Sequence, residues 1–102
     1  MFRIIETTTD QLMIAEKISQ SIIDSKLSTC VQIIDGVKSY YIWKDKIVSS
    51  NEYTIKIKTV EKHINEISSI IKEKSNYDVP EIISYDFRME DEEYEKWFNE
   101  NI

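Results

Sequence analysis

The sequence has 102 residues, enough for a single domain with one hydrophobic core spanning residues 1–102. Its 13 Lys and Arg residues form no stripe and are outnumbered by 19 Asp and Glu residues, so a nucleic-acid-binding surface is not expected. The single cysteine, Cys30, excludes an internal disulfide and a paired-cysteine zinc or redox site. It favours a reducing, cytoplasmic location. No apolar run approaches the roughly 20 residues of a membrane span, and the start is too short and strand-like for a signal peptide.

The first two predicted elements are a strand and an amphipathic helix. Residues 2–8 are apolar and β-branched and end in a run of threonines, which predicts a strand. In residues 11–26 the apolar side chains recur at spacings of three and four, which predicts a helix with one core-facing side. Thr9 and Asp10 are the expected N-cap residues.

The next predicted elements form a long antiparallel hairpin. Residues 28–34 predict a strand that ends at Asp35-Gly36, a signal for a turn or a bulge. Residues 38–59 are rich in β-branched and aromatic residues, and Lys44-Asp45-Lys46 divides them into two arms. In the second arm, Tyr53, Ile55, Ile57 and Thr59 alternate with polar side chains, as in a strand with two different faces.

The hairpin is long for its domain. At about 3.3 Å per residue, an arm of residues 47–59 would span roughly 40 Å, against a diameter of roughly 26 Å for a domain of this size. The arm must therefore bend, most naturally at Ser49-Ser50-Asn51, or its tip must project. A projecting tip would expose Tyr40, Tyr41 and Trp43, and such an apolar edge requires a partner. We therefore expect an oligomer.

The rest of the chain completes an α+β fold. Residues 60–74 predict a second amphipathic helix, 75–80 a loop, 81–87 a short strand, and 91–99 a third helix packed through its aromatic residues. The order β-α-β-β-α-β, followed by a C-terminal helix, is that of a ferredoxin-like sandwich. Two helices would cover one face of the sheet. The other face has no helix of its own, which again indicates a partner subunit.

Several runs of residues, in order and with compatible spacing, resemble the CutA divalent-cation tolerance family. These runs are Cys30-Val31-Gln32-Ile33, Ser39-x-Tyr41-x-Trp43 with Ile47, Glu52-Tyr53, Ile57-Lys58-Thr59, Tyr77-Asp78-Val79-Pro80-Glu81-Ile82, and Trp97 in the last helix. The resemblance implies a cytoplasmic homotrimer in which neighbouring hairpins pair edge to edge. It also implies a role in the response to divalent metal ions, with copper or zinc as the candidate cation and without an enzymatic reaction.

The metal ligands implied by the resemblance are incomplete. Glu52 is the one ligand with a clear counterpart. Ser75 stands where the family often has a histidine, and Glu6 where some bacterial members have a cysteine. Asp45 replaces the usual glycine of the hairpin turn. A copper site made of soft or nitrogen ligands is therefore not expected to be complete.

Five residues are candidates to line a cleft between subunits: Cys30, Trp43, Lys58, Tyr77 and Glu81. All of them except Tyr77 also have a structural alternative. Cys30 also fits a buried small hydrophobe, and Glu81 also fits a residue that positions a strand end. Lys58 could instead form an ion pair with Glu52 on a solvated sheet.

Other candidates are less specific. The aromatic cluster of Tyr40, Tyr41 and Trp43 suits assembly and also the wall of a ligand pocket. His63, the only histidine, is expected to face solvent, and Glu90–Glu93 is expected to be a solvated helix start.

No feature of the sequence predicts catalysis. It contains no strand-turn nucleophile elbow, acid/base pair or cofactor motif. The alternative to a metal-response protein is a signalling or scaffold trimer, similar to PII proteins. Such a trimer would bind a small anionic ligand between subunits through Lys58 and the aromatic residues.

Overall fold

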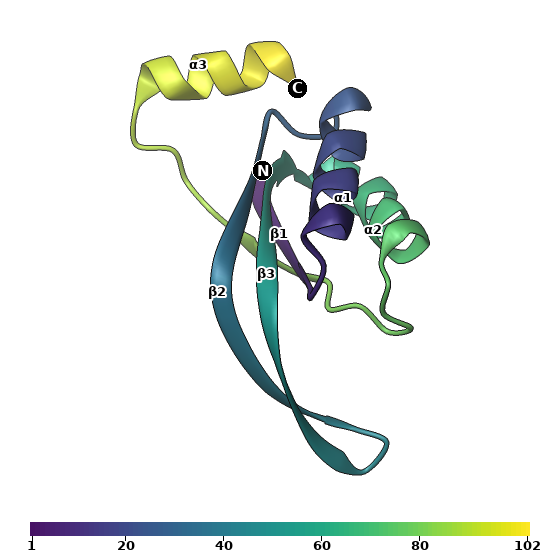
Figure 1. The fold of residues 1–102 in the computed structure, drawn as a ribbon. Helices are drawn as coiled ribbons and strands as arrows, with labels where there is room; N and C mark the ends of the chain where they lie inside the picture. Colours follow the sequence, from purple (N-terminus) through teal and green to yellow (C-terminus); the bar gives the residue numbers. More distant parts are fainter.

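The computed structural model describes Met1–Ile102 and has the predicted α+β architecture (Figure 1). Its four strands form one antiparallel sheet in the order β2-β3-β1-β4, and α1 and α2 lie side by side on one face. This is the ferredoxin-like fold, with a long central hairpin and a C-terminal helix. The elements are β1 (Phe2–Thr9), α1 (Leu12–Asp24), β2 (Cys30–Trp43), β3 (Lys46–Val60), the 3-10 helix η1 (Glu61–His63), α2 (Ile64–Lys74), β4 (Ile83–Asp86) and α3 (Glu92–Asn101).

The core lies between the sheet and the two helices. Ile5 of β1 pairs with Ile57 of β3, and both are fully buried. Ile18 of α1 and Ile67 of α2 cover them from the helix layer, also with essentially no exposed surface. Each such side chain contributes about 1.5–3 kcal/mol through its removal from water. The apolar residues recur at every second position in the strands and about every 3.6 positions in the helices, and both sets therefore pack into one apolar layer.

The hairpin projects from this body. β2 and β3 pair from Cys30↔Lys58 to Trp43↔Lys46, and the molecule measures 46 × 25 × 21 Å. The predicted bend at Ser49-Ser50-Asn51 is wrong, because these residues stay in register with β2. The irregularity lies instead in β2, where the register shifts between Ile34 and Val37. Asp35-Gly36 is thus a β-bulge, and Gly36, at φ 84°, supplies the left-handed residue.

A two-residue turn closes the hairpin. Trp43 and Lys46 pair directly, so Lys44 and Asp45 alone connect the strands. Both have positive φ, at 50° and 65°. This is the backbone of a type I′ turn, whose twist matches that of the strands. Asp45 adopts this conformation at moderate cost because Asp tolerates the left-handed region better than most residues.

Several element ends differ from the prediction. Neither Thr9 nor Asp10 is the N-cap of α1; that position is Gln11, and its N–H donates to Thr9 Oγ1 at 3.2 Å. The second helix begins with the 3-10 turn of η1, which contains a half-buried His63. The fourth strand is limited to Ile83–Asp86.

α3 covers one end of the sheet face opposite α1 and α2, so the prediction that this face has no helix is wrong there. Phe98 is fully buried, and its ring lies 5.5 Å from that of Phe2 and 6.4 Å from that of Phe87. Trp97 is 43% exposed, so it does not pack back as predicted. Asp91 caps the helix by accepting a hydrogen bond from the Tyr94 N–H at 2.9 Å.

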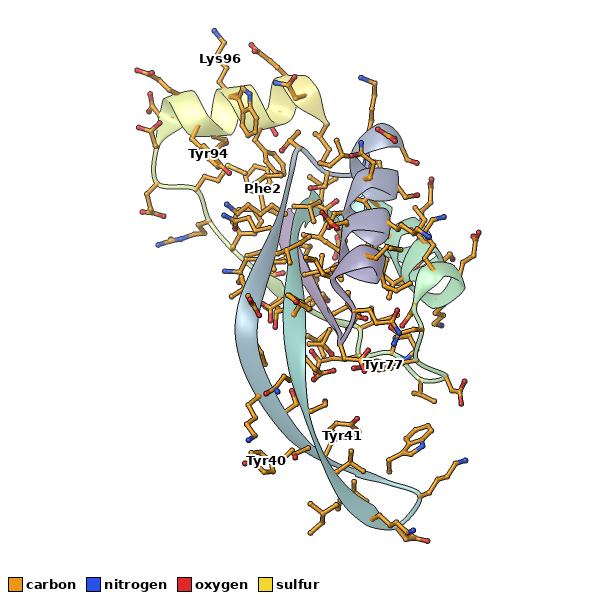
Figure 2. All side chains as sticks on the ribbon, viewed as in Figure 1. Phe2, Tyr40, Tyr41, Tyr77, Tyr94 and Lys96 are labelled. Carbon is orange, nitrogen blue, oxygen red and sulfur yellow. The ribbon has the colours of Figure 1, made fainter.

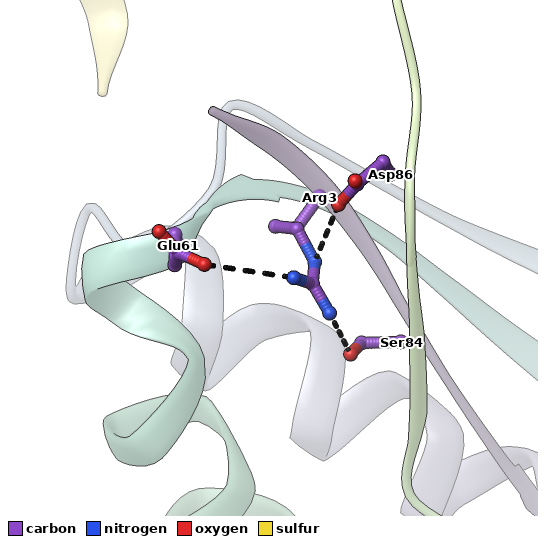
Figure 3. Close-up of polar contacts among 4 residues, drawn as sticks. All are labelled: Arg3, Glu61, Ser84 and Asp86. Carbon is purple, nitrogen blue, oxygen red and sulfur yellow. Dashed lines mark hydrogen bonds and ion pairs between the residues drawn. The ribbon is translucent and has the colours of Figure 1, made fainter.

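Arg3 ties the short edge strand to the body (Figure 3). Its guanidinium lies 3.2 Å from Asp86 Oδ1 and 3.6 Å from Glu61 Oε1, and it donates to Ser84 Oγ at 2.5 Å. One side chain on β1 thereby joins β4 and η1, and its planar fork of donors suits this three-way contact. No helix is long and apolar enough to cross a membrane.

Candidate functional site

A cleft of about 680 Å³ lies between the hairpin and the loop that joins α2 to β4. Tyr41 and Trp43, two residues apart on β2, share one strand face and line it. Figure 2 shows Tyr41 on the side of the hairpin that faces Tyr77, and Tyr40 on the other side. The lining residues are Thr8, Ser39, Tyr40, Tyr41, Ile42, Trp43, Glu52, Asn76, Tyr77, Asp78, Val79, Pro80 and Glu81.

Glu52 and Tyr77 join the two walls of the cleft. Glu52 is only 5% exposed, although it is a carboxylate on a strand of the projecting hairpin. The Tyr77 hydroxyl donates to Glu52 Oε2 at 2.6 Å. This is a short hydrogen bond to a charged acceptor, which belongs to the stronger class of hydrogen bonds. It connects the α2–β4 loop to the hairpin.

Asn76 fixes the loop to the end of β1. The Thr9 hydroxyl donates to Asn76 Oδ1 at 2.6 Å, and Asn76 Nδ2 donates to Asp10 Oδ1 at 2.8 Å. Ser75 Oγ accepts a further hydrogen bond from the Tyr77 N–H at 3.1 Å. Sequence reasoning missed the contacts of Asn76 with Thr9 and Asp10 because these partners are more than 60 positions apart. The only local signal was the clustering of polar turn-forming residues at both places.

The electrostatics of the cleft are acidic. Its carboxylates are Glu52, Asp78 and Glu81, and no Lys, Arg or His lines it. The pKa of Glu81 is raised by partial desolvation of its carboxyl group, although the residue as a whole is exposed, and the charges of Glu52 and Glu6 raise it further. Burial, followed by the hydrogen bond and charge of Glu52, raises the pKa of the Tyr77 hydroxyl, which remains a donor at all ordinary pH values. The cleft therefore attracts cations and disfavours an anionic ligand.

The structure brings most of the predicted site residues together. Trp43, Tyr77 and Glu81 line one cleft with the predicted metal ligand Glu52 and with Tyr41 of the assembly set. Tyr40 is in the lining set as well, but its side chain is 70% exposed.

Cys30 and Lys58 lie elsewhere. They face each other across β2 and β3 at the far end of the hairpin. Lys58 Nζ donates to the Tyr94 hydroxyl at 3.3 Å and lies 5.6 Å from the centre of that ring, so it forms no ion pair with Glu52. Cys30 is half-buried. The assignment of the cleft to a subunit interface stays a prediction.

The donor set of one chain does not fit a copper or zinc ion. No three His, Cys, Asp or Glu side chains converge as a metal site, whereas zinc sites are built from three or four such ligands. The two positions that depart from the family make hydrogen bonds instead. Ser75 contacts Tyr77, as described, and Glu6 Oε2 accepts from the Tyr85 hydroxyl at 2.7 Å.

Comparison with known proteins identifies similar chains in bacteria, plants and archaea. The chloroplastic protein CutA of Arabidopsis thaliana is 32% identical over 82 residues, which are 80% of this chain and 45% of the relative. The divalent-cation tolerance protein CutA of Thermus thermophilus is 28% identical over 88 residues, 86% of this chain and 85% of the relative. The chain thus spans about half of the plant protein and most of the bacterial one.

A solved structure shares the whole fold. The periplasmic divalent cation tolerance protein CutA of Archaeoglobus fulgidus superposes with a TM-score of 0.92 at 28% identity, covering 99% of this chain and 98% of that one. The words chloroplastic and periplasmic in these names contradict the prediction of a cytoplasmic location. A single cysteine and a compact fold do not determine the compartment.

The family model described as CutA1 divalent ion tolerance protein matches residues 3–101, which is nearly the full chain. The match includes all of the strands and helices except the first residue of β1, and it includes the hairpin and the loop that form the cleft. This chain belongs to the CutA1 divalent ion tolerance protein family.

Proposed function

We propose that this chain acts in the tolerance of divalent cations as a non-enzymatic homotrimer. Family membership supports the general role, and the exposed hairpin supports the assembly. Any copper or zinc ion that the protein holds would be bound with ligands from more than one subunit, because one chain does not assemble a complete set.

The observation that carries the assembly is apolar surface left open on one chain. At the hairpin tip Tyr40, Ile42 and Ile47 are 70%, 75% and 82% exposed. On the sheet face away from α1 and α2, Ile83 and Tyr85 are 49% and 39% exposed. Soluble proteins rarely leave such patches uncovered. The free edge of β2, 14 residues long, adds unpaired backbone groups that a neighbouring strand can satisfy.

The alternative, a trimer that binds a small anionic ligand, has less support. The cleft residues include three carboxylates and no basic side chain, and Lys58 lies beside Tyr94 instead. An anion would enter the cleft against its charge.

The metal proposal is tested by calorimetric titration of copper and zinc into the full chain, with Glu52→Gln and Glu93→Gln as matched variants. Both substitutions remove one negative charge, but Glu93 lies on the exposed first turn of α3. We expect Glu52→Gln to weaken binding and Glu93→Gln to leave it unchanged. If neither ion binds at micromolar concentration, and Glu52→Gln changes nothing, direct metal binding by this chain is wrong.

A further inference from the structure

The cleft combines two kinds of side chain, of which the proposed function uses only Glu52. Tyr41, Trp43 and Tyr77 provide aromatic rings, while Glu52, Asp78 and Glu81 provide carboxylates. The ion pairs of the chain involve Arg3, Arg88 and Lys96, so none of them neutralises these three carboxylates. Negative charge at this site has no cationic partner within the chain.

The size and construction of the cleft suit a small molecule. Its volume of about 680 Å³ falls within the roughly 300–1,000 Å³ of small-molecule sites. The walls are held in place, because Tyr77 is bonded to the buried Glu52 and the adjacent Asn76 is bonded to the end of β1. Tyr41 and Trp43 remain 39% and 40% exposed, which leaves part of each side chain accessible to a ligand.

The chemistry of the lining selects among cations. A metal ion needs converging lone pairs, and no set of three carboxylate, imidazole or thiolate groups converges here. An organic ammonium group carries a more diffuse charge than a metal ion, and it is attracted both by aromatic faces and by carboxylates. We propose that this cleft binds an organic ammonium cation, with the rings of Tyr41, Trp43 and Tyr77 around its methyl or methylene groups and Glu52 and Glu81 opposing its charge.

Tetramethylammonium is a suitable probe, with tert-butyl alcohol as an uncharged control of similar size. The chain has two tryptophans, so a Trp97→Phe background leaves Trp43 as the only indole reporter within the cleft. The titration uses the full chain with EDTA present, so that its outcome is independent of metal binding. We expect a saturable change in Trp43 fluorescence with tetramethylammonium and none with tert-butyl alcohol. Added salt should weaken the response.

Variants locate the site. Tyr41→Leu removes one ring and should weaken binding about tenfold, equivalent to about 1.4 kcal/mol. Glu81→Gln should weaken binding by a similar factor, and because Glu81 is exposed its replacement does not disturb the core. Glu93→Gln, which changes the net charge equally, should leave affinity within about twofold. Lys46 pairs with Trp43 across the hairpin. Its positive charge repels an ammonium ligand, so Lys46→Gln should tighten binding.

Three results would overturn the proposal. The first is no saturable response at concentrations well above the millimolar range. The second is an equal response to tert-butyl alcohol, which would indicate a merely apolar groove. The third is a response that appears only after subunits are dissociated by dilution, which would indicate that a second copy of the chain fills the cleft. None of these depends on the copper and zinc titration, so failure of one proposal is distinguishable from failure of the other.

Discussion

The two ends of the β2–β3 hairpin carry similar residues in different surroundings. Near the body, Ile55 and Ile57 of β3 are fully buried beneath α1 and α2. Near the tip, Ile47 of the same strand is 82% exposed, and Ile42 opposite it is 75% exposed. Strand formation therefore does not distinguish the two ends. What distinguishes them is whether another element of the same chain covers the strand.

The side chains at the base of the hairpin therefore stabilise the fold, and those at its tip stabilise the proposed assembly. Burial at the base stabilises each chain by itself, whereas apolar side chains at the tip contribute only when a second chain covers them. Glu52 and Tyr77 lie at the junction between the two regions, where the loop from α2 meets the hairpin.

The largest expected effect is a difference in the free energy of unfolding when the same substitution is made at the two ends of β3. Ile57→Ala leaves a cavity in the core and should lower the free energy of unfolding by about 2–5 kcal/mol. Ile47→Ala should change it by less than about 0.5 kcal/mol in dilute, dissociated protein. Urea unfolding at several protein concentrations measures both. A large, concentration-independent loss for Ile47→Ala would show that the tip is stabilised within one chain.

The next effect concerns the junction. Tyr77→Phe removes the donor to the buried Glu52 carboxylate and should lower the free energy of unfolding by about 1–3 kcal/mol. Tyr85→Phe is the matched control, since it removes a tyrosine–carboxylate hydrogen bond to Glu6 at an exposed position. The control should cost less than about 1 kcal/mol. Equal losses from the two substitutions would mean that burial of Glu52 is unimportant.

A smaller effect, of opposite sign, is expected at Glu81. Its folded-state pKa is raised, so the native chain binds more protons than the unfolded chain above the ordinary carboxyl range. This group therefore makes stability fall as pH rises through its folded pKa. Glu81→Gln should raise the free energy of unfolding at pH 7, by less than about 1 kcal/mol because Glu81 is exposed. At a pH near 3.5, where the side chain is protonated in both states, the difference should vanish. A loss of stability at pH 7 would contradict the repulsion among Glu6, Glu52 and Glu81.

The smallest effect is expected at the turn. Asp45 has φ 65°, and glycine adopts this conformation without strain. Asp45→Gly should therefore stabilise the hairpin by about 0.5 kcal/mol. Nuclear magnetic resonance of the tip amides would report slower hydrogen exchange. Lys72→Gly, in the last turn of α2, is the opposite case: it should destabilise, because glycine is a poor helix former. Faster exchange in Asp45→Gly would exclude a strained turn.

Much of the fold was predictable because it rests on local periodicity. Alternation in β3 and the spacing of apolar residues in α1 and α2 identify the elements, and their order identifies the topology. The location of the bulge was predicted only as one of two candidates. Ser49-Ser50-Asn51 and Asp35-Gly36 are both polar interruptions, and only the pairing of β2 with β3 places the bulge at the second.

Only part of the site was predicted from the sequence. Trp43, Tyr77 and Glu81 do line one cleft with Glu52. Lys58 shares a strand with Glu52 but lies six residues further along β3, where α3 supplies Tyr94 as its partner. Alternation assigns a residue to a face of the sheet, but it does not give its position along that face relative to the helix and loop that cover it.

The mass of the protein in solution tests most directly the proposal that the hairpin tip is an assembly surface. Light scattering at micromolar concentration should give three times the 12.1 kDa mass of one chain. Tyr40→Glu should shift the distribution towards the single chain, because it places a charge on the exposed apolar tip. A wild-type mass of 12.1 kDa would contradict the proposed trimer.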